Sequence, residues 1–271
     1  MRSAEPDTEL RSAEDAGCAP AEHRALNSTR QVVHRASHEI NYSWVLQSLL
    51  IVLSVIAGST DTIGFLEFHG LFTAHITGNL IVLAAHIFEG GDAQTAKILS
   101  VPVFILTINA TVVMATGLKQ VGCRPLCPLL LLEFALLLAF LLLNVATDPR
   151  TNSNATSAIV AGMLGVSAMA IQNVLVQISL KGAPSTAVMT TNVTRAAIDL
   201  GEMLLGRNAT DRSEARKRVM RTLPVIVGFA VGCGLGVACE AALGLWSLAL
   251  PVGVALLACA IALATPVDAQ F

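Results

Sequence analysis

The polar residues of one predicted helix in the second half of the chain have the types and the spacing to bind a solute or an ion. The segment "TTNVTRAAIDLGEM" carries four of them at spacings of three and four residues, namely Asn192, Arg195, Asp199 and Glu202. Such spacings place side chains on one face of an α-helix. Arg195 and Asp199 are placed to form an ion pair, and the carboxylates of Asp199 and Glu202 could take up protons or bind a cation.

A second polar segment, "GLFTAHITGNLIVLAAHI", carries His75, Thr77, Asn79 and His86 among apolar residues. His75 and His86 lie 11 residues apart, close to three helical turns, so they share a face. Because histidine titrates near neutral pH, this pair predicts either a proton relay or a separate polar contact for each ring. Asp61 precedes the segment, and its carboxylate would either line a site or have a structural role, capping a helix end or holding a turn.

The two polar segments occupy matching places in the sequence. A shift of 113 residues aligns residues 76–79 with residues 189–192. A shift of 112 aligns Asp61 with Asn173. We interpret this as a tandem duplication, in which Asn79 and Asn192 either bond across the interface of the two repeats or line a site. The candidate substrate-binding residues, expected where residues 71–88 and 187–205 meet, are Asp61, His75, Thr77, Asn79, Asn173, Thr190, Asn192, Arg195 and Asp199.

The elements that must position these residues are predicted to be membrane-spanning helices. The 271 residues are 54% hydrophobic and 13% charged, whereas soluble domains are about a quarter charged. Six apolar stretches have about the 20 residues needed to cross a bilayer: 45–65, 98–118, 126–146, 157–180, 222–242 and 246–265. We therefore expect an all-α integral membrane protein of six transmembrane helices, with the two polar segments short or re-entrant, or eight if these also cross.

The charged residues predict the orientation and the domain limits. Residues 1–43 lack an apolar period and predict a disordered cytoplasmic tail, followed by a first membrane repeat at 44–146 and a second at 155–266. Lys and Arg concentrate in the predicted loop 206–221 and in the tail. Since cytoplasmic loops retain these residues, we expect a multi-pass protein of the cell membrane with both termini in the cytoplasm.

Two longer stretches resemble a known family. "AGSTDTIGFLEFHGLFTAHITGNLIVLAAHI" and "MAIQNVLVQISLKGAPSTAVMTTNVTRAAIDLGEML" resemble the YoaK family of small multi-pass membrane proteins. The motifs that carry the resemblance are Asp61-x-x-Gly64-Phe65, Thr77-Gly78-Asn79, Gln172-Asn173 and Met189-Thr190-x-Asn192. The resemblance covers about residues 45–265. It implies a domain of unknown function that is presumed to be permease-like.

The sequence favours transport over catalysis. It has no P-loop, G-x-S-x-G, H-E-x-x-H or C-x-x-C motif, so we expect no enzyme activity, no cofactor and no metal site. We expect a secondary transporter or permease for a small solute or ion, and the alternative is a membrane scaffold or a protein that interacts with lipid or a partner. The expected partners are the lipid bilayer, the solute and a second copy through Gly228, Gly232 and Gly236, but no nucleic acid. Glu133, early in its span, is expected to reach the membrane surface.

Overall fold

The structure, a computed structural model, describes residues 44–88, 95–149, 155–180, 182–206 and 208–264. The chain divides into two compact units, Met1–Val45 and Leu46–Phe271, and the fold described below belongs to the second. The predicted disordered tail at 1–43 lies outside the described residues.

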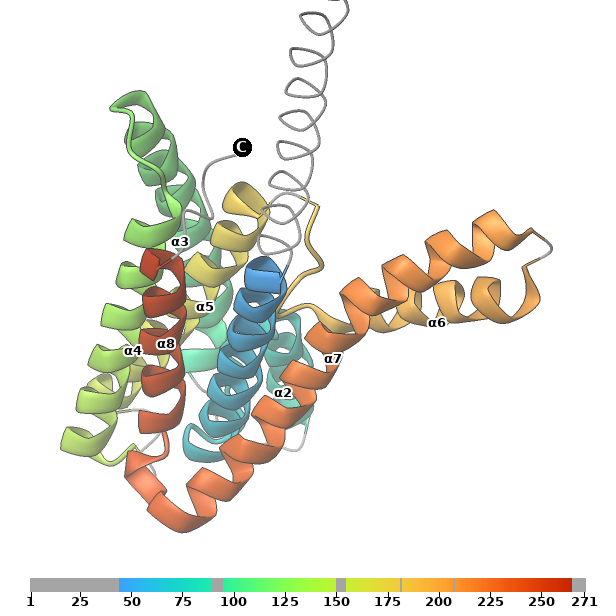
Figure 1. Ribbon diagram of the computed structural model, residues 1–271. Coiled ribbons are helices and arrows are strands. Elements are labelled where there is room, and N and C mark those ends of the chain that lie inside the picture. Colours follow the sequence, from blue (N-terminus) through green and yellow to red (C-terminus); the bar gives the residue numbers. More distant parts are fainter. Residues whose placement is uncertain (1–43, 89–94, 150–154, 181, 207, 265–271) are drawn as a thin grey trace, which may run out of the picture. The chain divides into compact units, whose positions relative to one another are not determined.

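Every regular element among the described residues is a helix. The first described helix spans Trp44–Glu67 and is followed by the elements that Figure 1 labels: α2 (Ile76–Phe88), α3 (Thr95–Gln120), α4 (Leu126–Thr147), α5 (Thr156–Ser179), α6 (Met189–Leu205), α7 (Ala209–Leu243), the 3-10 turn η1 (Gly244–Trp246) and α8 (Ala249–Ala264). The predicted all-α class is therefore confirmed for the described part of the chain.

Five of these helices are long and apolar enough to cross a membrane. They are the first helix, α3, α4, α5 and α7, which continues through η1 to Trp246. The sixth expected span corresponds to α8, which has 16 residues and so reaches about 24 Å at 1.5 Å per residue. This is short of a hydrocarbon core of about 30 Å, and the count of six spans stays a prediction.

The long helix α7 contains a segment that we expected to be a loop. It has 35 residues, or about 52 Å, which is longer than a bilayer core requires. Its charged first half, within the predicted loop 206–221, is helical from Ala209 and packs along α6 (Figure 1). The expected span 222–242 makes up the apolar remainder of α7.

A row of three glycines brings α7 against the first helix. Gly228, Gly232 and Gly236 are buried on one face of α7. A Cβ atom on Gly232 would stand 2.5 Å from the carbonyl oxygen of Val55, so only glycine permits this approach. The face that we expected to receive a second copy is therefore covered by a helix of the same chain.

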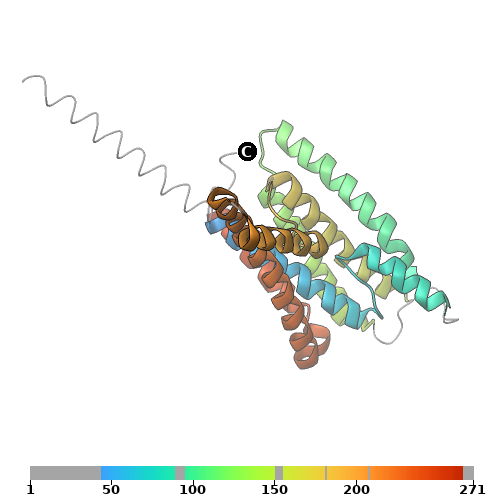
Figure 2. The ribbon, with the colours of Figure 1, turned by 90° about the vertical axis from the view of Figure 1, so that its right-hand side faces the viewer.

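The centre of the fold lies around α5, where most inward side chains are fully buried. Helices α3 and α4 pack on α5, and α8 packs on α4 (Figure 2). Glu133 lies in α4 with 1% of its surface exposed, so the expectation that it reaches the membrane surface is wrong. Neither of its carboxylate oxygens has a hydrogen-bond partner within the described part of the chain.

The helices of the two predicted repeats follow one order. The first helix and α5 each have 24 residues, and each is followed by a non-helical segment, a short helix and a longer helix. The short helices begin at Ile76 and Met189, 113 residues apart. The duplication itself stays a prediction, but the helix boundaries agree with the shift that suggested it.

Candidate functional site

Asp61 ties the end of the first helix to the non-helical segment that precedes α2. Its carboxylate is 4% exposed, and its Oδ1 accepts hydrogen bonds from the backbone N–H groups of Thr73 and Ala74, each at 2.7 Å. Buried backbone N–H groups outside a helix need such partners, because an unpaired one costs free energy comparable to a lost hydrogen bond. Asp61 therefore stabilises the turn into α2.

His75 completes the site at the second oxygen of the same carboxylate. Its Nδ1 lies 2.7 Å from Oδ2 of Asp61, and the ring is about one-third exposed. His75 lies outside the five candidate spans, and its pKa is raised above 6.5 mainly by the hydrogen bond to Asp61; burial opposes this and the charge of Asp61 adds to it. The two residues form a hydrogen-bonded pair of ionisable side chains.

Asn79 holds the same segment from the side of α2. The side-chain oxygen accepts from the backbone N–H of Phe72 at 2.7 Å, and the amide donates to the Phe72 carbonyl at 2.8 Å. The amide also donates to Oγ of Ser100 in α3 at 2.9 Å. Asn79 is fully buried by these contacts, so it positions the segment and the two helices rather than facing a solute.

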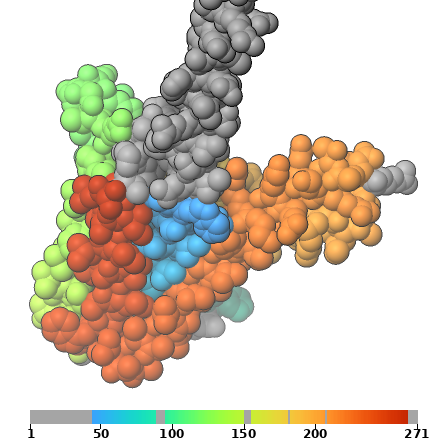
Figure 3. All heavy atoms as spheres, viewed as in Figure 1, coloured from blue at the N-terminus to red at the C-terminus, as the bar shows by residue number. Residues whose placement is uncertain are grey.

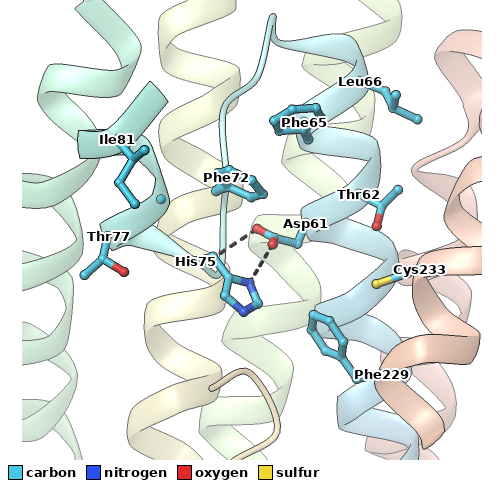
Figure 4. A pocket seen from close by; sticks show the side chains of 11 residues that line it. Asp61, Thr62, Phe65, Leu66, Phe72, His75, Thr77, Ile81, Phe229 and Cys233 are labelled. Carbon is cyan, nitrogen blue, oxygen red and sulfur yellow. Dashed lines mark hydrogen bonds and ion pairs between the residues drawn. The ribbon is translucent and has the colours of Figure 1, made fainter. Parts of the chain in front are cut away.

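A pocket of about 480 Å³ opens beside the pair of Asp61 and His75 (Figure 4). Its walls come from the first helix, the segment before α2, α2 itself and α7, and most are apolar or aromatic. The His75 ring points to Asp61 and packs edge-on to Phe229 of α7, with ring centroids 5.5 Å apart. The lining residues are Asp61, Thr62, Phe65, Leu66, Phe72, His75, Thr77, Gly78, Ile81, Phe229 and Cys233.

The second half of the chain uses a neutral amide where the first uses a carboxylate. Gln172 of α5 is fully buried, and its Nε2 donates to Oγ1 of Thr186 at 2.8 Å and to the carbonyl of Leu53 at 2.9 Å. Thr186 lies 113 residues after Thr73, which contacts Asp61. The counterpart of Asp61 is therefore Gln172 and not the aligned Asn173, whose amide only donates to Met169 one turn back in α5.

Asn192 repeats the contact of Asn79. Its amide donates to the carbonyl of Ser185, seven residues before it, at 2.6 Å. Asn79 donates to Phe72 across the same interval. The two asparagines therefore hold their own segments, and the expected bond between them is not formed.

The charged face of α6 pairs with α7 rather than with itself. Arg218 donates to Asp199 at 2.6 Å and to Glu202 at 2.5 Å. The predicted pair of Arg195 and Asp199 is therefore wrong, because α7 supplies the cation. Arg195 and Asp199 instead line a second pocket of about 330 Å³, together with Arg218 and Arg221.

The structure divides the expected site residues among different surroundings. Asp61, His75 and Thr77 line the first pocket, Arg195 and Asp199 line the second, Asn79, Asn173 and Asn192 hold backbone, and Thr190 is exposed on α6. Sequence reasoning missed Phe229 and Arg218, and it named Gln172 only as part of a motif that carries the family resemblance. Arg218 was counted only as a loop charge, and Phe229 carried no signal beyond its place in an apolar helix.

The fold and these contacts define a helical, multi-pass membrane protein with a non-helical segment before α2. Residues 49–261 match the family described as a protein of unknown function (DUF1275), and the chain belongs to that family. No curated protein and no solved structure matches the chain.

Proposed function

We propose that the protein is a secondary permease for a small solute, and that the pocket beside Asp61 and His75 is its binding site. The observation that carries the proposal is the pocket itself, which places an ionisable pair inside a mostly apolar cavity next to a non-helical segment. In transporters, broken helices at membrane depth mark such sites, because their backbone and side chains can face a cavity.

The chemistry of the pocket limits the solute. Phe65, Phe72 and Phe229 supply aromatic walls, whereas the polar groups concentrate at Asp61 and His75. We infer a solute with an apolar body and one polar group that hydrogen-bonds to the pair. A proton that moves on or off His75 would couple transport to a proton gradient, because histidine is the side chain whose ordinary pKa lies closest to neutral pH.

The orientation belongs to the same proposal. The charged first half of α7 carries Arg216, Lys217, Arg218 and Arg221, and such residues are retained on the cytoplasmic side. We place this end of α7 and both termini in the cytoplasm of the cell membrane.

A membrane scaffold is the second candidate, and one observation favours it. Oδ1 of Asp61 accepts hydrogen bonds from backbone N–H groups, and the side chain of Asn79 forms its hydrogen bonds with Phe72 and Ser100. These hydrogen bonds stabilise the fold, so a protein that transports no solute would need them too. The two candidates differ in whether the pocket takes up a ligand.

Uptake by proteoliposomes that enclose a pH-sensitive dye tests the transport proposal. Small solutes with one polar group are added singly, and a permease coupled to protons changes the internal pH. Thr77→Trp places a large ring at the pocket wall and should abolish the signal. Thr190→Trp is the matched control, because Thr190 is the equivalent exposed residue on α6 outside this pocket.

Cys233 provides a direct assay of occupancy. It lines the pocket and is half-buried, whereas Cys239, also half-buried on α7, does not line it. In variants that keep one of the two thiols, a transported solute should slow alkylation of Cys233 and leave Cys239 unchanged. If no solute moves through the wild-type protein or protects Cys233, the scaffold is favoured.

A further inference from the structure

The second pocket, between α6, the segment before it and α7, has the composition of an anion site. Its volume is about 330 Å³, and it is lined by Gly182, Pro184, Arg195, Ile198, Asp199, Arg218, Arg221 and Thr222. Three of these side chains are guanidinium groups, which come from two different helices. Nothing in the proposed transport function uses them.

The ion pairs at this pocket leave two of the three arginines available. Arg218 is engaged by Asp199 and Glu202, so the nearby carboxylates are already neutralised in part. Among the described residues, neither Arg195 nor Arg221 has a hydrogen bond or an ion pair. Two guanidinium groups that have no partner within the described part of the chain therefore line one cavity.

The position of the pocket along α7 sets its depth in the membrane. The apolar part of α7 runs from Thr222 to Leu243, or 22 residues, which span about 33 Å, close to the thickness of the hydrocarbon core. Arg221 therefore lies where α7 leaves the bilayer. This end of α7 and α6 form the orange surface in Figure 3.

An exposed apolar side chain lies beside the arginines. Ile198, which lines the pocket together with Arg195 and Arg221, is 57% exposed. A phosphate between the guanidinium groups would thus have apolar surface next to it for acyl chains. Basic pockets of this kind on the cytoplasmic side of a bundle bind anionic lipid headgroups.

We propose that this pocket binds an anionic phosphate group through Arg195 and Arg221. Guanidinium forks match the oxygens of a phosphate and hold it by two parallel hydrogen bonds. The apolar rim favours the headgroup of an anionic phospholipid as the source of the phosphate. The proposal is independent of whether the first pocket transports a solute.

Thermal unfolding of the purified full-length protein in detergent tests the site. Short-chain phosphatidylglycerol is titrated in one arm, inorganic phosphate in a second, and zwitterionic phosphatidylcholine in a third, all at one ionic strength. A ligand that binds the folded state raises the melting temperature with concentration. We expect phosphatidylglycerol to stabilise the protein and phosphatidylcholine to have at most a tenth of its apparent affinity.

The variants separate the pocket from general attraction to a charged surface. The double substitution Arg195→Gln and Arg221→Gln should weaken the binding of phosphatidylglycerol at least tenfold. Arg216→Gln with Lys217→Gln removes the same charge from α7 outside the pocket and should change the affinity less than twofold. Arg195→Lys with Arg221→Lys keeps the charge but loses the two guanidinium groups. Its affinity for phosphatidylglycerol should lie between the affinities of the two glutamine double variants.

The arms also identify the source of the phosphate. If inorganic phosphate reproduces the stabilisation with the same dependence on Arg195 and Arg221, the site is supported and its ligand is a soluble phosphate. Equal weakening by the two double variants, or no stabilisation by either anion, overturns the proposal. If the double glutamine variant does not fold, the two single glutamine variants are compared with Arg216→Gln by the same criterion.

Discussion

The segments before α2 and before α6 are each held by a polar side chain of the preceding helix, but the hydrogen bonds run in opposite directions. Before α2, the carboxylate of Asp61 accepts from backbone N–H groups of the segment and also pairs with His75. Before α6, the amide of Gln172 donates to the side-chain hydroxyl of Thr186. The first half therefore has an ionisable pair where the second half has a neutral amide.

Removing the side chain of Asp61 or of Gln172 should have the largest effect on the free energy of unfolding, and the two losses should differ. Asp61→Ala deprives two backbone N–H groups and the partly exposed His75 of their partner, at a cost of about 3–5 kcal/mol, because each buried N–H group left unpaired costs about 1–3 kcal/mol. Gln172→Ala loses two hydrogen bonds and should cost about 1–3 kcal/mol. The free energy of unfolding is measured in mixed micelles titrated with sodium dodecyl sulphate. Equal costs would mean that Asp61 acts only as another backbone anchor.

The paired asparagines give a smaller contrast. Asn79 makes three hydrogen bonds, to both backbone groups of Phe72 and to Ser100, and Asn79→Ala should cost about 2–3 kcal/mol. Asn192 has one backbone bond, to Ser185, and a contact to the sulfur of Met189, so Asn192→Ala should cost about 1 kcal/mol. The same unfolding titration measures both. A larger loss for Asn192→Ala would contradict the contacts described for α6.

The pH dependence of stability should also come from the first half of the chain, through His75. The pKa of His75 is raised in the folded protein, so its contribution is complete below the unfolded pKa of about 6.5 and is lost as the pH rises through the folded pKa. Melting temperatures of the wild type should therefore fall across that window. His75→Gln should flatten this part of the profile, whereas Gln172→Ala should keep its slope. A slope unchanged in His75→Gln would assign it to another group.

The helices could be predicted from the sequence because length and hydropathy fix them. The expected span 126–146 became α4 at Leu126–Thr147, and the repeated Thr-x-Asn triplets lie in the first turns of α2 and α6. The first half of α7 was expected to be a loop on account of its charges. It is helical and packs along α6, where Arg218 binds the carboxylates of Asp199 and Glu202, and a sequence pattern does not show which charges will meet.

The partners of the polar residues were harder to predict for a related reason. Asp61 was expected either to line a site or to cap a helix end or hold a turn, and it lines the pocket and holds the turn into α2. Arg195 was assigned to Asp199 by spacing within one helix, although a neighbouring helix provides a better-placed cation. Spacing gives the face of a helix, whereas the packing of helices decides what that face meets.

The smallest expected effect tests the equivalence of Asp61 and Gln172 directly. Sequence alignment matched Asp61 with Asn173, but Asn173 donates only to Met169 within α5, and side chains that bond one turn back contribute little to a helix. Asn173→Ala should therefore change the free energy of unfolding by less than about 0.5 kcal/mol, below the cost of Gln172→Ala in the same titration. A loss for Asn173→Ala that matched Gln172→Ala would restore the sequence alignment. A change below that limit would identify Gln172, rather than Asn173, as the residue of α5 that corresponds to Asp61. Because Gln172 is neutral, the ionisable pair would then belong to the first half alone.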